Sequence, residues 1–115
     1  MEYEVLKESG ALEAQTYFGY IGKKYAGCIT GIPFNEHRFE ILSSTLKEEF
    51  RGTKAVRAWK EITDAIFEDY PVITTRISNK DNAEIKIVLS AGFHIVGTKT
   101  YKDDISVEIL KTRED

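Results

Sequence analysis

The sequence contains little of what several protein classes require. Its single cysteine, Cys28, excludes an intrachain disulfide. The one cysteine and two histidines do not show the spacing typical of metal ligands, which argues against a metal site. No apolar run approaches the roughly 18 residues of a membrane-spanning helix. The acidic N-terminus also lacks the basic-then-apolar form of a secretion signal. We therefore expect a cytoplasmic protein with no metal and no membrane partner.

An excess of positive charge is missing as well. The formal net charge is −3, whereas domains that bind nucleic acid usually present a basic surface, so we expect no nucleic-acid partner. Hydrophobic residues make up 42% of the chain and charged residues 30%, which is typical of globular proteins. There is no repeat, linker or low-complexity tract. We therefore expect a single domain spanning residues 1–115.

The first half of the chain predicts an antiparallel meander. Residues 15–21 are rich in aromatic side chains, residues 25–34 are rich in small ones, and residues 38–46 carry the third strand-like pattern. Turn-forming residues separate the three segments. Residues 2–8 add either a further strand or a turn. This half therefore predicts three consecutive strands that pair antiparallel with their neighbours.

The apolar period then changes to that of a helix over residues 53–69, with Trp59 on its apolar stripe. A β-branched strand follows at residues 72–77. Asp81 and Glu84 resemble a capping box that opens a short helix, and Gly92 suits its left-handed C-terminal position.

Two more strands follow, at residues 93–99 and 105–109, so the predicted order is β-β-β-α-β-α-β-β. A helix connects the strand at 38–46 to the one at 72–77, and such crossovers join parallel strands. The sequence therefore predicts an α/β domain built on a mixed sheet (α+β in the arrangement of its strands).

The segment around Arg51 and Gly52 carries the chemical signal, because a strand ends there, a glycine permits a turn and a helix begins. The unpaired N–H groups of a helix start suit an anion. The helix also places its charges against its own dipole, with bases early and acids late: the bases are Arg51, Lys54, Arg57 and Lys60, and the acids are Glu61, Asp64, Glu68 and Asp69. Either a bound polyanion such as a pyrophosphate compensates, or this is a basic solvated face.

These features together resemble the GNAT superfamily of N-acyltransferases. The resemblance rests on the meander, Phe50-Arg51-Gly52 with its helix, Asn82-Ala83, and Ala91-Gly92-Phe93, and covers roughly residues 15 to 102. The family's signature is Arg/Gln-x-x-Gly-x-Gly/Ala at the pyrophosphate loop, with a later Asn-containing helix that ends in Gly-Phe. The chain resembles short phage-encoded members of this family, some of which are head-assembly factors rather than enzymes. The resemblance implies a GNAT-like fold and acetyl-CoA as the cofactor.

The resemblance also implies the site residues. The backbone of Thr45 and Leu46 would pair with the pantetheine amides. The turn and helix start would hold the pyrophosphate, and Asn82 is either a helix-start residue or a further cofactor contact. The turn and helix-start residues are Arg51, Gly52, Thr53, Lys54, Ala55 and Val56.

The catalytic base of the family lies on the strand before this loop. There Glu40 is the first candidate, and His37 has the better intrinsic pKa for the role. For both residues the alternative is a solvated or ion-paired surface side chain.

The sequence departs from the family pattern at three places. Lys54 and Val56 stand where the family has glycines, and Val88 stands where a tyrosine usually protonates the leaving thiolate. The chain also begins near the family's second strand, so the resemblance implies that it lacks the first strand and the first two helices, which wall the acceptor site. A second subunit of a homodimer could supply that wall.

Two functions remain open from the sequence. The first is an N-acetyltransferase that moves acetyl from acetyl-CoA to a primary amine of a small molecule or a protein. The second is a catalytically inactive GNAT-like phage protein that acts in assembly or as a protein-binding factor.

Overall fold

The computed structural model describes residues 2–10 and 13–115. Within these ranges the chain forms, in order, β1 (Tyr3–Ser9), β2 (Gln15–Ile21), β3 (Lys24–Pro33), β4 (Arg38–Leu46), the 3-10 helices η2 (Glu48–Phe50) and η3 (Gly52–Lys54), α1 (Ala55–Asp69), β5 (Val72–Ser78), α2 (Asn82–Ser90), β6 (His94–Tyr101) and β7 (Asp104–Thr112). From residue 15 onward the predicted order of strands and α-helices is confirmed, and β1 precedes it.

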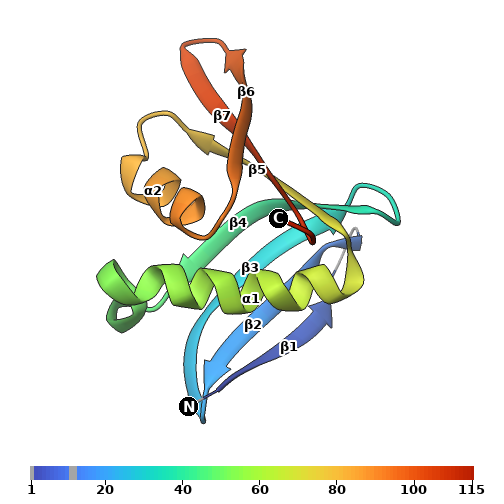
Figure 1. Ribbon diagram of the computed structural model, residues 1–115, viewed down its shortest axis with the longest axis vertical. Coiled ribbons are helices and arrows are strands. Elements are labelled where there is room, and N and C mark those ends of the chain that lie inside the picture. Colours follow the sequence, from blue (N-terminus) through green and yellow to red (C-terminus); the bar gives the residue numbers. More distant parts are fainter. Residues whose placement is uncertain (1, 11–12) are drawn as a thin grey trace.

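The strands form one sheet in the order β1-β2-β3-β4-β5-β7-β6 (Figure 1). Neighbouring strands are antiparallel except for β4 and β5, which are parallel and joined by α1. Both the meander and the parallel crossover predicted from the sequence are therefore confirmed.

Residues 2–8, for which the sequence predicts either a strand or a turn, fall largely in strand β1, so the lack of a first strand that the resemblance implied is not borne out. β1 pairs with β2 along its whole length, from Tyr3 opposite Ile21 to Ser9 opposite Gln15. In β1 only Tyr3 and Val5 are partly buried, and Val5 packs against the core. The residues between and after them are charged or exposed, so the alternation that reveals a strand extends over too few positions to be decisive.

β4 and β5 separate after a short paired stretch, which runs only from Arg38 opposite Val72 to Ile41 opposite Thr75. On its other side β4 bulges, because the pairing with β3 shifts there and leaves Leu42 as an extra residue. Among the described residues, β4 has no strand partner on the β5 side beyond Ile41. We call this divergence of β4 from β5 the split.

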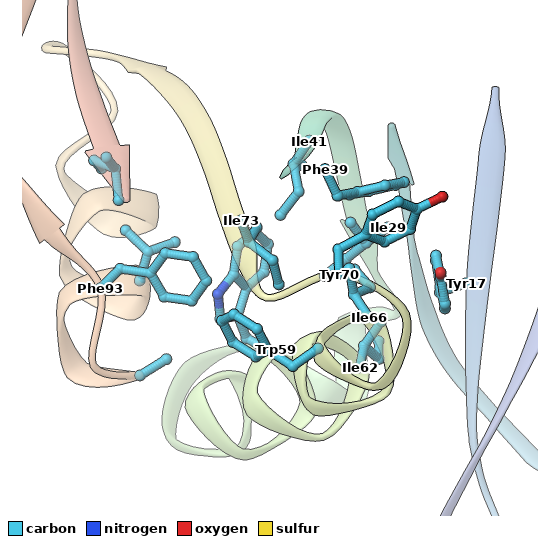
Figure 2. Close-up of a cluster of buried hydrophobic side chains, with 14 of the residues drawn as sticks. Tyr17, Ile29, Phe39, Ile41, Trp59, Ile62, Ile66, Tyr70, Ile73 and Phe93 are labelled. Carbon is cyan, nitrogen blue, oxygen red and sulfur yellow. The ribbon is translucent and has the colours of Figure 1, made fainter. Parts of the chain in front are cut away.

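Both helices pack on one face of the sheet. Trp59 and Ile62 of α1 share a buried cluster with Val88 of α2 and with Ile73 of β5. Figure 1 shows α1 lying across β1 to β4, and Figure 2 shows Trp59 beside Phe93, which lies three residues after the end of α2. In the part of the chain that the structure describes, no helix covers the opposite face. The prediction that Trp59 is a core residue is confirmed by its exposure of 2%.

The ends of the helices follow the predicted signals, with one shift. α2 is capped by Asp81, whose carboxylate accepts the backbone N–H of Glu84 at 3.1 Å, and Gly92 ends it with a φ of +95°. α1 begins at Ala55 rather than at residue 53, because η3 occupies Gly52–Lys54 first. The start of α1 is therefore a tight turn followed by a helix.

No helix among the described residues is long and apolar enough to span a membrane.

Candidate functional site

The turn that leads into α1 is open and uncapped. Gly52 has a φ of +71°, a left-handed conformation that favours glycine, and a Cβ added there would meet no atom within 4 Å. Lys54, at the N-cap position of α1, makes no side-chain capping bond, and the first turn contains no acid. The N–H groups of this helix end therefore face a space in which an anion fits.

Two adjoining cavities extend from this turn between the end of β4 and α2. The inner cavity, about 510 Å³, is lined by Ser44, Thr45, Leu46, Arg51, Trp59, Asp81, Ala83, Glu84 and Ile87. The outer cavity, about 460 Å³, is lined by Gly52, Thr53, Val56, Ala83, Lys86, Ile87 and Ser90. Because Ala83 and Ile87 line both, the two cavities form one continuous groove, which we call the groove.

Most of the residues expected to hold a cofactor lie in the groove. Thr45, Leu46 and Arg51 line its inner part, and Gly52, Thr53 and Val56 line its outer part. The Nε of Arg51 donates to the carbonyl oxygen of Leu46 at 3.2 Å, which holds this cation against the end of β4.

Three expected residues are placed differently. The side chain of Ala55 is fully buried, so only its backbone can take part. Lys54 is exposed at the helix start and lines neither cavity. Asn82 is the exposed first residue of α2, and its neighbours Asp81 and Ala83 line the groove instead.

The bases of the helix start do not cluster as the sequence suggested. The guanidinium of Arg57 lies over the ring of Tyr3, 5.4 Å from its centroid, and Lys60 lines a separate cavity of about 620 Å³. Arg51 alone of the four lines the groove. Among the described residues, no carboxylate forms an ion pair with Arg51 or Lys54. The turn is therefore not occupied by the protein's own acids.

Of the two candidate bases, Glu40 lies in the first half of β4 and His37 lies just before its first residue. Glu40 precedes the last paired residue before the split, is partly buried, and accepts the hydroxyl of Thr74 at 3.1 Å. Its neighbours Phe39 and Ile41 are buried under the helices, so Glu40 points to the face without helices.

His37 lies in the loop before β4, and its side chain is 72% exposed. Its imidazole is 3.4 Å from the carboxylate of Glu36. His37 lies four residues before Ile41, where the split begins, which is roughly 13 Å along an extended strand at about 3.3 Å per residue. The structure brings Glu40 to the split but does not bring His37 there.

Sequence reasoning missed a contact across the groove. The hydroxyl of Ser44, on β4, donates to the carboxylate of Glu84, on α2, at 3.0 Å. Burial raises the pKa of Glu84; the Ser44 hydroxyl lowers it in part, while the nearby Asp81 carboxyl raises it further. The only available signal was the helical spacing of Ala83, Ile87 and Ser90, which places them on one face of α2.

Trp59 lines the inner cavity, whereas Val88 lies beneath it in the core. The indole N–H of Trp59 is buried and has no acceptor among the described residues, and its ring meets the Phe93 ring edge-on with centroids 6.1 Å apart (Figure 2). Val88, which stands where the resemblance has a tyrosine, is fully buried in the core. Val88 therefore presents no polar group to the groove.

Comparison with known proteins places this geometry in a fold. No protein-family model matches the sequence, and no curated protein matches it. Solved structures, in contrast, do match the chain. Aminoglycoside acetyltransferase AAC(6')-Ib, in complex with coenzyme A and kanamycin, matches with a TM-score of 0.73 at 18% identity, over 88% of this chain and 67% of that one.

Two further structures match nearly end to end. A GNAT family acetyltransferase from Elizabethkingia anophelis, with acetyl-CoA bound, gives a TM-score of 0.73 at 10% identity, over 96% of this chain and 98% of that one. A Bacillus subtilis acetyltransferase in complex with CoA gives 0.71 at 14% identity, over 96% and 97%. The chain has the GNAT fold, as the resemblance implied.

Proposed function

We propose that this chain is an N-acetyltransferase, which binds acetyl-CoA in the groove and transfers its acetyl group to a primary amine by direct attack. The observation that carries the proposal is the groove itself. It starts at an open, uncapped helix end beside Gly52 and runs along the unpaired edge of β4 to the split.

The groove matches the chemistry of the cofactor from end to end. The pyrophosphate fits the turn, where N–H groups of η3 and α1 and the Arg51 guanidinium supply positive charge. The pantetheine arm carries amides, and β4 presents backbone groups to them on the β5 side at Ser44 and Leu46. The backbone groups of Thr45 face β3 instead, because the N–H of Lys47, two residues further on, donates to Ala26 of β3. Two nearly end-to-end structural neighbours contain CoA or acetyl-CoA, which supports a complete site within a chain of this extent.

Acetyl-CoA supplies the activated thioester, and the residues of this chain position it and handle protons. With the pyrophosphate at the turn, the acyl end of the cofactor lies toward the split. Glu40 stands one residue before Ile41, the last residue of β4 that pairs with β5. We assign Glu40 as the base that takes a proton from the incoming ammonium, directly or through water.

The acceptor then approaches from the sheet face that no described helix covers. One structural neighbour was solved with kanamycin, an amine-bearing small molecule, which supports a small-molecule amine as the first class to test.

Thermal melting with coenzyme A tests the cofactor site. A ligand at 100 times its Kd stabilises the native state by about 2.7 kcal/mol, so the melting temperature should rise with coenzyme A and with acetyl-CoA. Arg51→Glu should abolish that rise, because it places a carboxylate in the groove. Lys60→Glu makes the same kind of charge change on α1 outside the groove and should preserve it. No rise at millimolar ligand would refute the proposal.

A second candidate, the catalytically inactive GNAT-like phage protein, has one observation in its favour. Val88 is buried and offers no acid to a leaving thiolate. Release of free thiol from acetyl-CoA, measured across polyamines, aminoglycosides and peptides, separates the two functions. The acetyltransferase releases thiol with at least one amine and loses this activity in Glu40→Gln, whereas the scaffold binds coenzyme A and releases none.

A further inference from the structure

Glu84 places a carboxyl group in the wall of the inner cavity. Its partner Ser44 lies closer to the split than Thr45 and Leu46, the other β4 residues in the inner cavity. The hydrogen bond of 3.0 Å between Ser44 and Glu84 therefore crosses the groove at its inner end. An acyl thioester whose pyrophosphate lies at Gly52 must bring its sulfur toward this contact.

We propose that Glu84 is the general acid that protonates the leaving sulfur of coenzyme A, in the role that Val88 cannot fill. The inference rests on the proposed acetyltransferase function. It assigns the acid to the α2 side of the groove and leaves the base, Glu40, on the opposite face of the sheet.

The proton balance of the step is as follows. The amine, after losing one proton to Glu40 or water, attacks the thioester carbonyl carbon through its nitrogen lone pair and forms a C–N bond. The tetrahedral intermediate then collapses, the C–S bond breaks and sulfur takes its electron pair. Glu84 gives its proton to that sulfur and becomes a carboxylate, the amide nitrogen gives its second proton to solvent, and solvent reprotonates Glu84.

The surroundings of Glu84 favour its protonated form. The carboxyl group is half-buried, and desolvation raises its pKa, as does Asp81, while the Ser44 hydroxyl lowers it. Asp81 and Arg51 are the other charged residues that line the inner cavity, and Asp81 is held as the helix cap by the N–H of Glu84. A carboxyl group whose pKa is raised keeps its proton to higher pH, which suits a donor to a thiolate.

Glu84→Gln tests the proposal, since glutamine keeps an acceptor for Ser44 but carries no transferable proton. The variant should bind coenzyme A with a Kd within about twofold of the wild type, whereas kcat should fall by about 100-fold, the lower end of general acid catalysis. The fall of kcat at high pH, where wild-type Glu84 loses its proton, should also disappear. Glu61→Gln, a matched change on α1 that does not line the groove, should leave kcat and its pH profile unchanged.

Asp81→Asn provides a second variant in case Glu84→Gln folds poorly. Asparagine preserves the helix cap but removes the charge that raises the pKa of Glu84. The alkaline limb of the kcat profile should therefore move to lower pH, a change that loss of a merely structural contact would not produce.

The outcomes separate the inference from the function on which it rests. If Glu84→Gln retains wild-type kcat and pH profile, the acid role is refuted while the acetyltransferase stands. If Glu84→Gln instead loses coenzyme A binding, Glu84 is a binding residue and the acid role is also refuted. A wild-type chain that binds no coenzyme A, or releases no thiol with any amine, overturns both.

Discussion

Gly31 lies where β3 faces the bulge of β4, and the geometry of the split depends on it. A Cβ at this position would collide with the backbone carbonyl of Glu40 and approach the Phe39 ring to 2.6 Å. Gly31→Ala should therefore destabilise the fold by about 3 kcal/mol, the upper range for overpacking. Gly97→Ala is the control, because its nearest neighbour is a Glu108 carboxylate oxygen at 3.9 Å. Chemical denaturation measures both, and equal small losses would contradict the packing argument.

Glu84 should also leave a signature in stability against pH. Its folded-state pKa is raised above the unfolded value, so its contribution is fully favourable below the unfolded pKa of about 4.3 and is lost as pH rises through the folded pKa. The free energy of unfolding of Glu84→Gln, relative to the wild type, should therefore increase with pH across this window. Ser44→Ala removes a bond that lowers the pKa and should extend the window upward. A difference that stays flat from pH 4 to 8 would contradict this.

At the scale of elements, the stability of α2 depends on the cap at its N-terminus. Asp81 accepts the N–H of Glu84 and is the only side-chain cap recorded for either α-helix. Asp81→Ala should cost about 1 kcal/mol of stability, whereas Asp81→Asn should cost little, because asparagine is an equally good cap. Thermal or urea unfolding distinguishes them. If both variants lost the same amount, the charge of Asp81 rather than its capping bond would be the stabilising feature.

The elements that sequence predicted well are those whose signal is local. Residues 15–21 and 38–46 form strands with the predicted bounds, and Asp81 and Gly92 mark the limits of α2 as expected. The start of α1 was misplaced by two residues, because a 3-10 turn and an α-turn share the same local pattern. For residues 2–8 the sequence does not decide between a strand and a turn, because the alternation of buried side chains is limited to the first residues of β1.

The site divides in the same way. Gly52, Thr53 and Val56 are close in sequence, so one wall of the groove's outer end can be predicted from the sequence. Ser44 and Glu84 are 40 residues apart, and only the fold brings them together. The departure of Arg57 toward Tyr3 likewise depends on β1, whose place in the sheet no local pattern reveals. Contacts between distant segments are set by tertiary packing, which no single-sequence period encodes.

At the scale of the whole molecule, the sheet ends in an exposed apolar strand. β6 is an edge strand, and Figure 1 shows its hairpin with β7 projecting from the body. Ile95, Val96 and Tyr101 of β6 are 52%, 60% and 74% exposed. Edge strands with apolar side chains favour pairing with another chain, so the homodimer expected from the sequence stays a prediction with β6 as its interface.

Sedimentation velocity tests that interface. The wild type should sediment as a dimer at micromolar concentration, and Val96→Lys should shift it to a monomer, since lysine on an edge strand opposes pairing. Leu6→Lys makes the same change on β1, at the other edge of the sheet, where Leu6 is 49% exposed, and should leave the dimer intact. A wild type that remains monomeric up to 100-fold higher concentration would exclude β6 as a dimer interface.

The four residue pairs that join β4 to β5 leave the sheet unfinished along half of β4. A ligand arm with amide groups spaced along it would take the position that a neighbouring strand occupies elsewhere in the molecule. The bound ligand would then stand in for a missing strand, and the protein would be most rigid while the ligand is bound. Hydrogen exchange at the amides of Ser44 and Leu46 would report that change, because these residues face the β5 side, whereas Lys47 and the residues in step with it face β3.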